Sequence, residues 1–226
     1  MEELKVWFTF NLFGYLFEVT SALIIQWLII GVALILSISY RRRIKKHPDR
    51  LQTAIETGVE FISKAVEENM GHGSKCFIPY VGSLAIYLLL LNMVGLFGIK
   101  PPTSDYSVSL GLALTSFFVI QGYTIKKLGI GGYFKGYASP LAVLLPINVM
   151  ERVMLPVSLS LRLYGNIFAA TMIMELIYEA LIGFNFITAI GIPIPFHFYF
   201  DLFDGAIQMV IFVMLTMINI KITAEH

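Results

Sequence analysis

Long apolar runs alternate with short polar, glycine-rich or proline-rich segments along this chain. A membrane-spanning helix needs about 20 mainly apolar residues, and five runs come close to that length or exceed it. These runs are residues 19–40, 77–99, 107–125, 141–182 and 196–224. The pattern therefore predicts an all-α integral membrane protein, a single membrane domain with five transmembrane helices.

Residues 48–70, between the first two runs, follow a different pattern. Apolar side chains recur there at helical spacing among polar ones, at Leu51, Ile55, Val59, Ile62 and Val66. Such spacing predicts an amphipathic helix, which we place on the cytoplasmic surface of the membrane. A loop helix that docks on protein is an alternative that the pattern leaves open.

The basic residues give the orientation of the spans. RRRIKKH, residues 41–47, closes the first run, and the lysines of KKLGIGGYFKG, residues 126–136, close the third. Short loops rich in lysine and arginine stay in the cytoplasm, so residues 1–18 form an outer segment and the C-terminus is cytoplasmic. The glycines of residues 126–136 predict a loop. The chain's start lacks a basic region and a cleavage site, so it is not read as a signal peptide.

The last two spans are unusually long. At 1.5 Å per residue, residues 156–182 extend about 40 Å and residues 196–224 about 43 Å, against a hydrocarbon core of about 30 Å. Polar residues also lie in the middle of both runs. We therefore expect these two helices to be strongly tilted.

Composition agrees with a membrane protein and excludes other classes. Hydrophobic residues make up 57% of the chain and charged residues 14%, where soluble domains carry roughly 25% charged residues. The mean hydropathy is +0.78. The net charge of +1 gives no reason to expect a nucleic-acid partner. A single cysteine allows no intrachain disulfide and suggests no metal site.

Polar residues inside the fourth span form two stripes. At roughly 100° per residue, Ser158, Arg162 and Asn166 share one face, and Thr171 and Glu175 lie on another. Arginine stays protonated under all ordinary conditions, so Arg162 cannot avoid burial by losing its charge.

The last span carries a polar stripe of its own. Asp201, Asp204, Gln208 and Asn219 fall within about 60° of one another at the same helical periodicity. An ionisable residue at mid-membrane costs at least about 2.5 kcal/mol, which makes it a candidate for a functional site.

Two structural alternatives remain open at this stage. Arg162 can form a buried ion pair with Asp201 or Asp204 that only fixes the register of the helices. Gln208 can act as a neutral hydrogen-bond partner that orients Arg162. Against simple pairing, the acids of these two spans outnumber the one arginine, and carboxylates that exchange protons beside water are what an ion path requires.

Three segments carry a family resemblance. LPVSLSLRLYGNIFAA, residues 155–170, resembles the arginine signature of subunit a of F-type ATP synthases. LNMVGLFGIKPPTSDYSV, residues 91–108, resembles that family's N-x-x-G-L-x-P motif followed by P-T-x-D. IQMVIFVMLTMINIKITAEH, residues 207–226, resembles its C-terminal motif. The five-span layout and the surface helix also agree with that family.

The resemblance implies roles for individual residues. Arg162 matches the arginine that faces the ring of c subunits, Asn166 the motif asparagine one turn on, and Gln208 the glutamine near the arginine. Asp201 matches a position of the outer access path. Asp105 matches the motif aspartate of the outer loop.

One position departs from the family pattern. Thr171 stands where the family usually has a glutamate of the access path. Glu175, one turn further on the same face, is a hypothetical replacement, so that Glu175, Asp201 and Asp204 would line the outer half-channel. Glu151 matches an acid before the motif and belongs to the cytoplasmic exit, unless it only pairs with Arg152.

The function that the resemblance implies is ion translocation. The chain would be the stator subunit whose two half-channels and arginine couple H⁺ or Na⁺ flow to rotation of the c-ring. Its partners would be the c-subunit ring, the b subunits of the peripheral stalk, the rest of the synthase and membrane lipid, in a bacterial plasma membrane. It would be non-catalytic and without cofactor, since no phosphate-binding loop is present to handle ATP.

Two other functions are compared with this one. A secondary ion-coupled transporter would also need charges inside the membrane, but no internal repeat is apparent. An intramembrane phosphotransferase is suggested by DLFDGA, residues 201–206, which resembles a D-x-x-D-G motif. That motif continues with Ala-Arg, where this chain has Gln208 and Met209.

Overall fold

The computed structural model describes residues 6–12, 15–42, 44, 49–71, 73–137, 143, 145–182 and 191–225. Within these residues, five helical segments are long and apolar enough to cross a membrane: Ser21–Arg41, Lys75–Phe97, Tyr106–Tyr133, Leu145–Ile182 and Pro193–Thr223. The predicted class, an all-α integral membrane protein with five spans, is confirmed.

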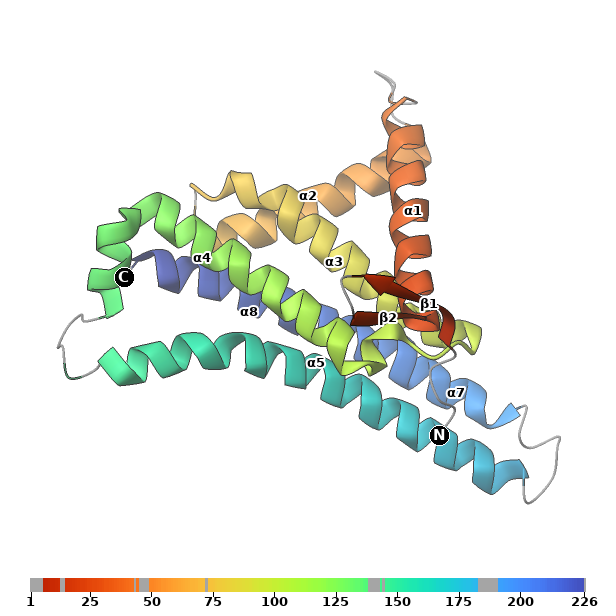
Figure 1. Ribbon diagram of the computed structural model, residues 1–226. Helices are drawn as coiled ribbons and strands as arrows, with labels where there is room; N and C mark the ends of the chain where they lie inside the picture. The colour runs from red at the N-terminus through yellow and green to blue at the C-terminus, as the bar shows by residue number, and fades with distance from the viewer. Residues whose placement is uncertain are drawn as a thin grey trace.

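The helical elements follow the predicted runs closely (Figure 1). They are α1 (Ser21–Arg41), α2 (Arg50–Met70), η1 (Lys75–Phe77), α3 (Ile78–Met93), η2 (Val94–Phe97), η3 (Pro102–Ser104), α4 (Tyr106–Tyr137), α5 (Leu145–Ile182), α7 (Pro193–His197), η5 (Phe198–Asp204) and α8 (Gly205–Glu225).

A small hairpin precedes the first span, where the sequence predicts only an outer segment. Strand β1 (Val6–Leu12) pairs antiparallel with β2 (Tyr15–Thr20), with Thr9 opposite Glu18. The hairpin lies at the first turn of α1 (Figure 1). The spans themselves remain entirely helical.

The core lies where α3, α4 and α8 pack together. Leu88 of α3, Ile120 of α4 and Phe212 of α8 are almost completely buried, and they belong to one continuous apolar cluster. These helices are apolar on most of their faces, which suits both a packed interior and lipid contact.

The packing of α2 distinguishes the two alternatives for residues 48–70, a helix on the membrane surface and a helix docked on protein. Val66 and Met70, in its second half, are buried in the cluster of α3, α4 and α8, whereas Leu51 and Val59, in its first half, are exposed. The second half therefore docks on protein, and the first half keeps an uncovered apolar face.

Residues 126–136 do not form the predicted loop. Helix α4 continues to Tyr137, with a single break at Gly129, whose φ is +73°. A residue without a β-carbon adopts this left-handed conformation readily. The chain therefore changes direction at one glycine and returns to helical structure.

Helix α5 is continuous over 38 residues, about 57 Å at 1.5 Å per residue. It begins at Leu145, so Pro146 occupies the first turn, where the missing N–H is not needed. It then passes through Pro156, although proline usually kinks or breaks a helix interior. The helix bends gently (Figure 1) and only a minor part of it is buried.

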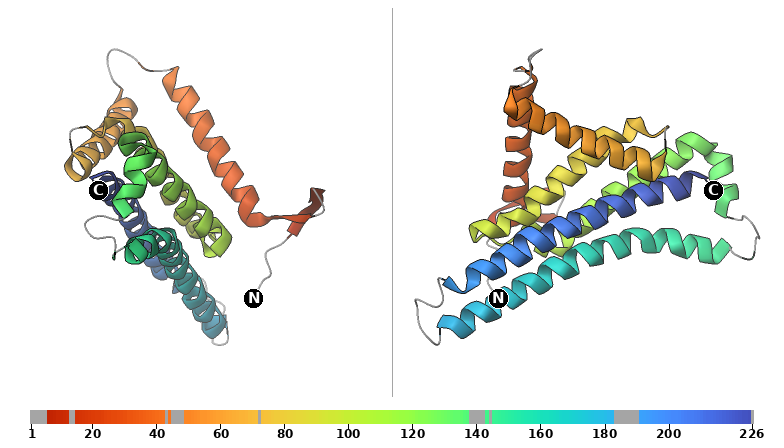
Figure 2. Two further views of the ribbon diagram at one scale, coloured as in Figure 1. Left: turned by 60° about the vertical axis from the view of Figure 1, so that its left-hand side comes forward. Right: turned by 180° about the vertical axis from the view of Figure 1, so that it is seen from behind.

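Helices α5 and α8 run side by side, and both cross α1 at a steep angle (Figure 2). Their lengths exceed a hydrocarbon core of about 30 Å. The predicted length of the last two spans is confirmed, and their strong tilt in a bilayer stays a prediction.

The last span does not have α-helical periodicity throughout. Phe198–Asp204 forms a π-helical segment, η5, before α8 begins at Gly205. A π-helical turn holds more residues than an α-helical turn, so the predicted polar stripe is valid only from Gly205 onward. Such segments are frequent at functional sites.

Candidate functional site

Polar residues on α5, on α8 and on the segments next to them fall into two groups, one at each end of the α5 and α8 pair. The Glu151 end is formed by residues 136, 145–155 and 219–223, and the Asp105 end by residues 92–106, 175–182 and 191–205. Arg162 lies between the two groups.

Arg162 is exposed on α5, next to the fully buried Leu163. Among the described residues, no acidic side chain forms an ion pair with it. The predicted alternative, an internal pair with Asp201 or Asp204, is therefore not present in this structure. A permanent cation is left on an uncovered face of a helix that crosses the membrane.

Asn166 and Gln208 meet between α5 and α8. The Asn166 Nδ2 donates a hydrogen bond of 2.8 Å to Gln208 Oε1. Gln208 is completely buried, and its Nε2 has no acceptor in the described part of the chain. The suggested hydrogen bond between Gln208 and Arg162 is replaced by this one.

A cavity of about 460 Å³ opens at the Glu151 end. It extends from Glu151 to Arg162 along α5, a distance of about 16 Å at 1.5 Å per residue. Ser158 lines it between them, and Asn219 and Thr223 line it from α8. The cavity is roomy and polar enough to hold several waters.

Glu151 does not pair with Arg152 as the structural alternative suggests. The Arg152 Nη1 instead donates to Gln121 Oε1 of α4, at 3.3 Å, and that oxygen also accepts a hydrogen bond from Tyr133. Neighbouring residues on a helix point in directions about 100° apart. Glu151 itself is exposed and lines the cavity.

Asp201 lies in a hydrogen-bonded chain at the Asp105 end. Its Oδ2 is 2.6 Å from His197 Nδ1, and His197 Nε2 is 2.9 Å from the Tyr178 hydroxyl. Tyr178 comes from α5, His197 from α7 and Asp201 from η5. The chain therefore joins two long helices through one imidazole ring.

Gly95 and Asn92 fix the segment that carries Asp201. A β-carbon at Gly95 would lie 2.5 Å from Asp201 Cγ, so only glycine leaves room for this carboxyl group. Asn92 Nδ2 donates to the Gly205 carbonyl oxygen at 3.0 Å, and Asn92 Oδ1 accepts from Thr103 Oγ1 at 3.1 Å. The Asn92 side chain is almost completely buried.

The remaining predicted residues of this end have other partners, or none, among the described residues. Glu175 Oε1 is 3.9 Å from Lys100 Nζ, and both side chains are largely exposed. Asp204 is half-buried and has no hydrogen bond or ion pair to another described residue. Thr171, at the position of the missing glutamate, donates to the Ile167 carbonyl oxygen of its own helix.

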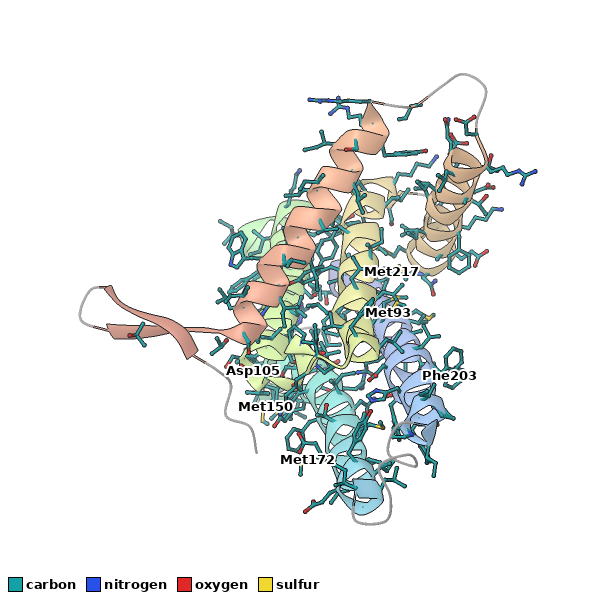
Figure 3. All side chains as sticks on the ribbon, turned by 90° about the vertical axis from the view of Figure 1, so that its right-hand side faces the viewer. Met93, Asp105, Met150, Met172, Phe203 and Met217 are labelled. Carbon is teal, nitrogen blue, oxygen red and sulfur yellow. The ribbon has the colours of Figure 1, made fainter. Side chains whose placement is uncertain are left out.

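Asp105 lies apart from the Asp201 chain. Its Oδ1 accepts a hydrogen bond from the Ser107 N–H in the first turn of α4, at 2.9 Å. This is the usual contact of a residue that caps a helix. Figure 3 shows Asp105 beside the start of α1, on the other side of the molecule from Phe203 of η5.

Sequence reasoning missed His197, Tyr178, Asn92 and Gly95 as parts of the site. His197 precedes Asp201 by four residues, which places both on one helical face. Asn92 and Gly95 belong to a quoted motif whose role the sequence does not reveal. Among the described residues, no group of three His, Cys, Asp or Glu side chains could hold a metal ion.

Comparisons with known proteins agree with the resemblance found in the sequence. The family model for the ATP synthase A chain matches residues 21–221. The chain belongs to this family. It is 31% identical to the sodium-ion-specific ATP synthase subunit a of Propionigenium modestum, over 92% of this chain and 75% of the relative. It is 33% identical to subunit a of Staphylococcus carnosus, over 96% and 97%.

A third relative, subunit a of Moorella thermoacetica, is 34% identical over 70% of this chain and 73% of its own length. The chain is therefore an ion-translocating membrane subunit of an F-type ATP synthase. A secondary transporter and an intramembrane phosphotransferase are not favoured.

Proposed function

We propose that this subunit provides two separate half-channels, and that Arg162 keeps them apart while it discharges the ring of c subunits. The observation that carries the proposal is an exposed arginine without an acidic partner among the described residues, at the head of a polar cavity. The bare face of α5 is where the ring would pass.

The physical argument starts from the carboxylate that each c subunit carries at mid-membrane. While that group faces lipid, a bound ion must neutralise it. When it reaches Arg162, the fixed positive charge favours the ionised carboxylate, and the bound ion leaves. The same charge repels a cation that would otherwise pass directly between the two half-channels.

The inner half-channel corresponds to the cavity at the Glu151 end. Its polar lining leads from Glu151 past Ser158 to Arg162, and the basic loops of the sequence support a cytoplasmic location for this end. The N-terminus would then be outside and the C-terminus inside a bacterial plasma membrane.

The outer half-channel corresponds to the Asp105 end, with Asp201 as its central acid and Glu175 and Asp204 beside it. The translocated ion is H⁺ or Na⁺, and no cofactor is required. The c-ring and the b subunits are the direct partners. ATP chemistry takes place on other subunits, so this chain is non-catalytic.

The test is ATP-driven ion uptake, with passive leak, in vesicles that carry the whole complex, with and without Na⁺. Arg162→Ala is expected to abolish coupled uptake while the complex still assembles. Lys64→Ala, which removes an exposed positive charge on α2, serves as the control and keeps uptake. Coupled uptake that survives Arg162→Ala would show that the proposal is wrong.

A further inference from the structure

A histidine contacts the central acid of the Asp105 end directly. The His197 side chain is 23% exposed and that of Asp201 12% exposed, so the imidazole is the more accessible of the two. Its two ring nitrogens have different partners, Tyr178 on one side and Asp201 on the other.

We propose that His197 transfers protons along the outer half-channel, between water and Asp201. This inference rests on the proposed function, because it assigns a relay to the outer path that Asp201 defines. It also offers a substitute for the glutamate that is missing at Thr171, because the titratable partner of Asp201 lies one turn away on the same span.

The geometry allows His197 to change charge without moving. In the neutral ring, Nδ1–H donates to the Asp201 carboxylate and Nε2 accepts from the Tyr178 hydroxyl. In the protonated ring, Nδ1–H still donates to Asp201, and Nε2–H donates to the Tyr178 oxygen after its hydroxyl rotates. Both states keep both hydrogen bonds.

The transfer balances as follows. A proton from water binds to Nε2 and forms the imidazolium. The Nδ1 proton then moves to Asp201 Oδ2, which leaves a neutral ring with its proton on Nε2 and a neutral carboxyl group. Asp201 gives its proton to the c-ring carboxylate. Water then takes the Nε2 proton while Nδ1 gains a proton from water, which restores the first tautomer. Imidazole is the side chain best suited to such exchange near neutral pH.

The other charged groups described at this end do not contact Asp201, so they are not placed to exchange a proton with it as His197 is. Glu175 lies 3.9 Å from Lys100, and this pair is largely exposed. Glu179 of α5 is exposed, and Asp204 of η5 has no polar contact with a described residue. Gly95 lies against the Asp201 carboxyl group and closes one side of it. His197 is thus the titratable group in direct contact with Asp201.

A purely structural role is the alternative, in which His197 only holds Asp201 in place. Two substitutions separate the roles. His197→Asn retains an amide near Nδ1 that can donate to Asp201, and His197→Gln retains one near Nε2 that can bond to Tyr178. Neither amide can accept and release a proton.

The experiment measures ATP-driven H⁺ uptake in vesicles that carry the whole complex, between about pH 5 and pH 8, the range in which histidine changes charge. Both His197 variants are expected to lower uptake at least about tenfold and to flatten its pH profile, since a general acid–base group contributes that much or more. Tyr178→Phe should have a smaller effect and shift the profile. Tyr199→Phe is the control, since the contacts of this neighbouring tyrosine with described residues are ring contacts.

Three results would overturn the relay while leaving the proposed function intact. One is a native rate and pH profile in His197→Asn. Another is a native profile in His197→Gln, should the Asn variant fail to assemble. The third is uptake that requires Na⁺ and is insensitive to both variants. In each case Arg162→Ala would still abolish coupling. If Arg162→Ala retains coupled uptake, the proposed function itself fails.

Discussion

The two ends of the α5 and α8 pair differ in how their polar groups are arranged. At the Glu151 end an open cavity of about 460 Å³ lies along the helices, and Arg152, which lines it, is held by Gln121 from α4. At the Asp105 end the polar groups are in direct contact, with Asp201 held between Gly95 and His197.

The difference suggests two kinds of ion path in one subunit. A wide polar cavity conducts through water, and the identity of each lining side chain has little influence. A path of directly bonded side chains depends on every member, because a misplaced or missing group interrupts the chain of hydrogen bonds. Substitutions should therefore reduce ion uptake more at the Asp105 end than at the Glu151 end. A substitution of Arg162 should reduce it most.

The largest effect is expected at the boundary between the two ends. Arg162→Lys keeps the formal charge, but a lysine can lose its proton when desolvated and lacks the planar guanidinium. ATP-driven ion uptake should fall at least about tenfold, with the complex still assembled. Uptake close to the native rate would mean that a simple positive charge is sufficient.

Gly95→Ala should have the next largest effect. The added β-carbon would lie 2.5 Å from Asp201 Cγ, so the carboxyl group must move and its contact with His197 is disturbed. Coupled uptake should fall severalfold. Gly111→Ala is the matched control, since its β-carbon meets no atom within 4 Å. Equal activity of the two variants would contradict the tight packing around Asp201.

A bulky side chain in the cavity should have a moderate effect. Ser158→Phe places a ring in the cavity between Glu151 and Arg162, and it displaces water without supplying polar groups. We expect a partial loss of uptake, and a smaller loss for Ser158→Ala, which leaves the volume open. If the two variants behave alike, the serine hydroxyl rather than the open volume is important.

The smallest effect is expected for Glu151→Gln. The cavity can hold water beside this position, and water-mediated contacts are nearly as favourable as direct ones. Uptake should fall by no more than about threefold, since water still reaches Arg162. A loss as large as that of Asp201→Asn would remove the contrast between the two ends.

The sequence alone determined the membrane class, the five spans and the identity of the principal charged residues. Apolar runs of this length have few structural alternatives, because a bilayer forces every backbone group to bond within a helix. Arg162 stands out for a related reason: it is a charge whose cost in the membrane demands a function.

The partners of these residues could not be read from the sequence. Uniform α-helical periodicity places Asp201 and Gln208 on one stripe, but the π-helical segment Phe198–Asp204 changes the direction in which Asp201 points. Similarly, the glycines of residues 126–136 suggest a loop, although only Gly129 leaves helical geometry. Local propensity is a weak guide where tertiary contacts compensate for it.

The tertiary structure decided which polar groups meet. Asn92 and Gly95 are distant in sequence from η5, yet Asn92 bonds to the Gly205 carbonyl oxygen directly after it, and Gly95 lies against the Asp201 carboxyl group. His197 acquires significance only because Tyr178 reaches it from α5. Sequence encodes the cost of each buried polar group, whereas the packing of α3, α5 and η5 determines which neighbour offsets that cost.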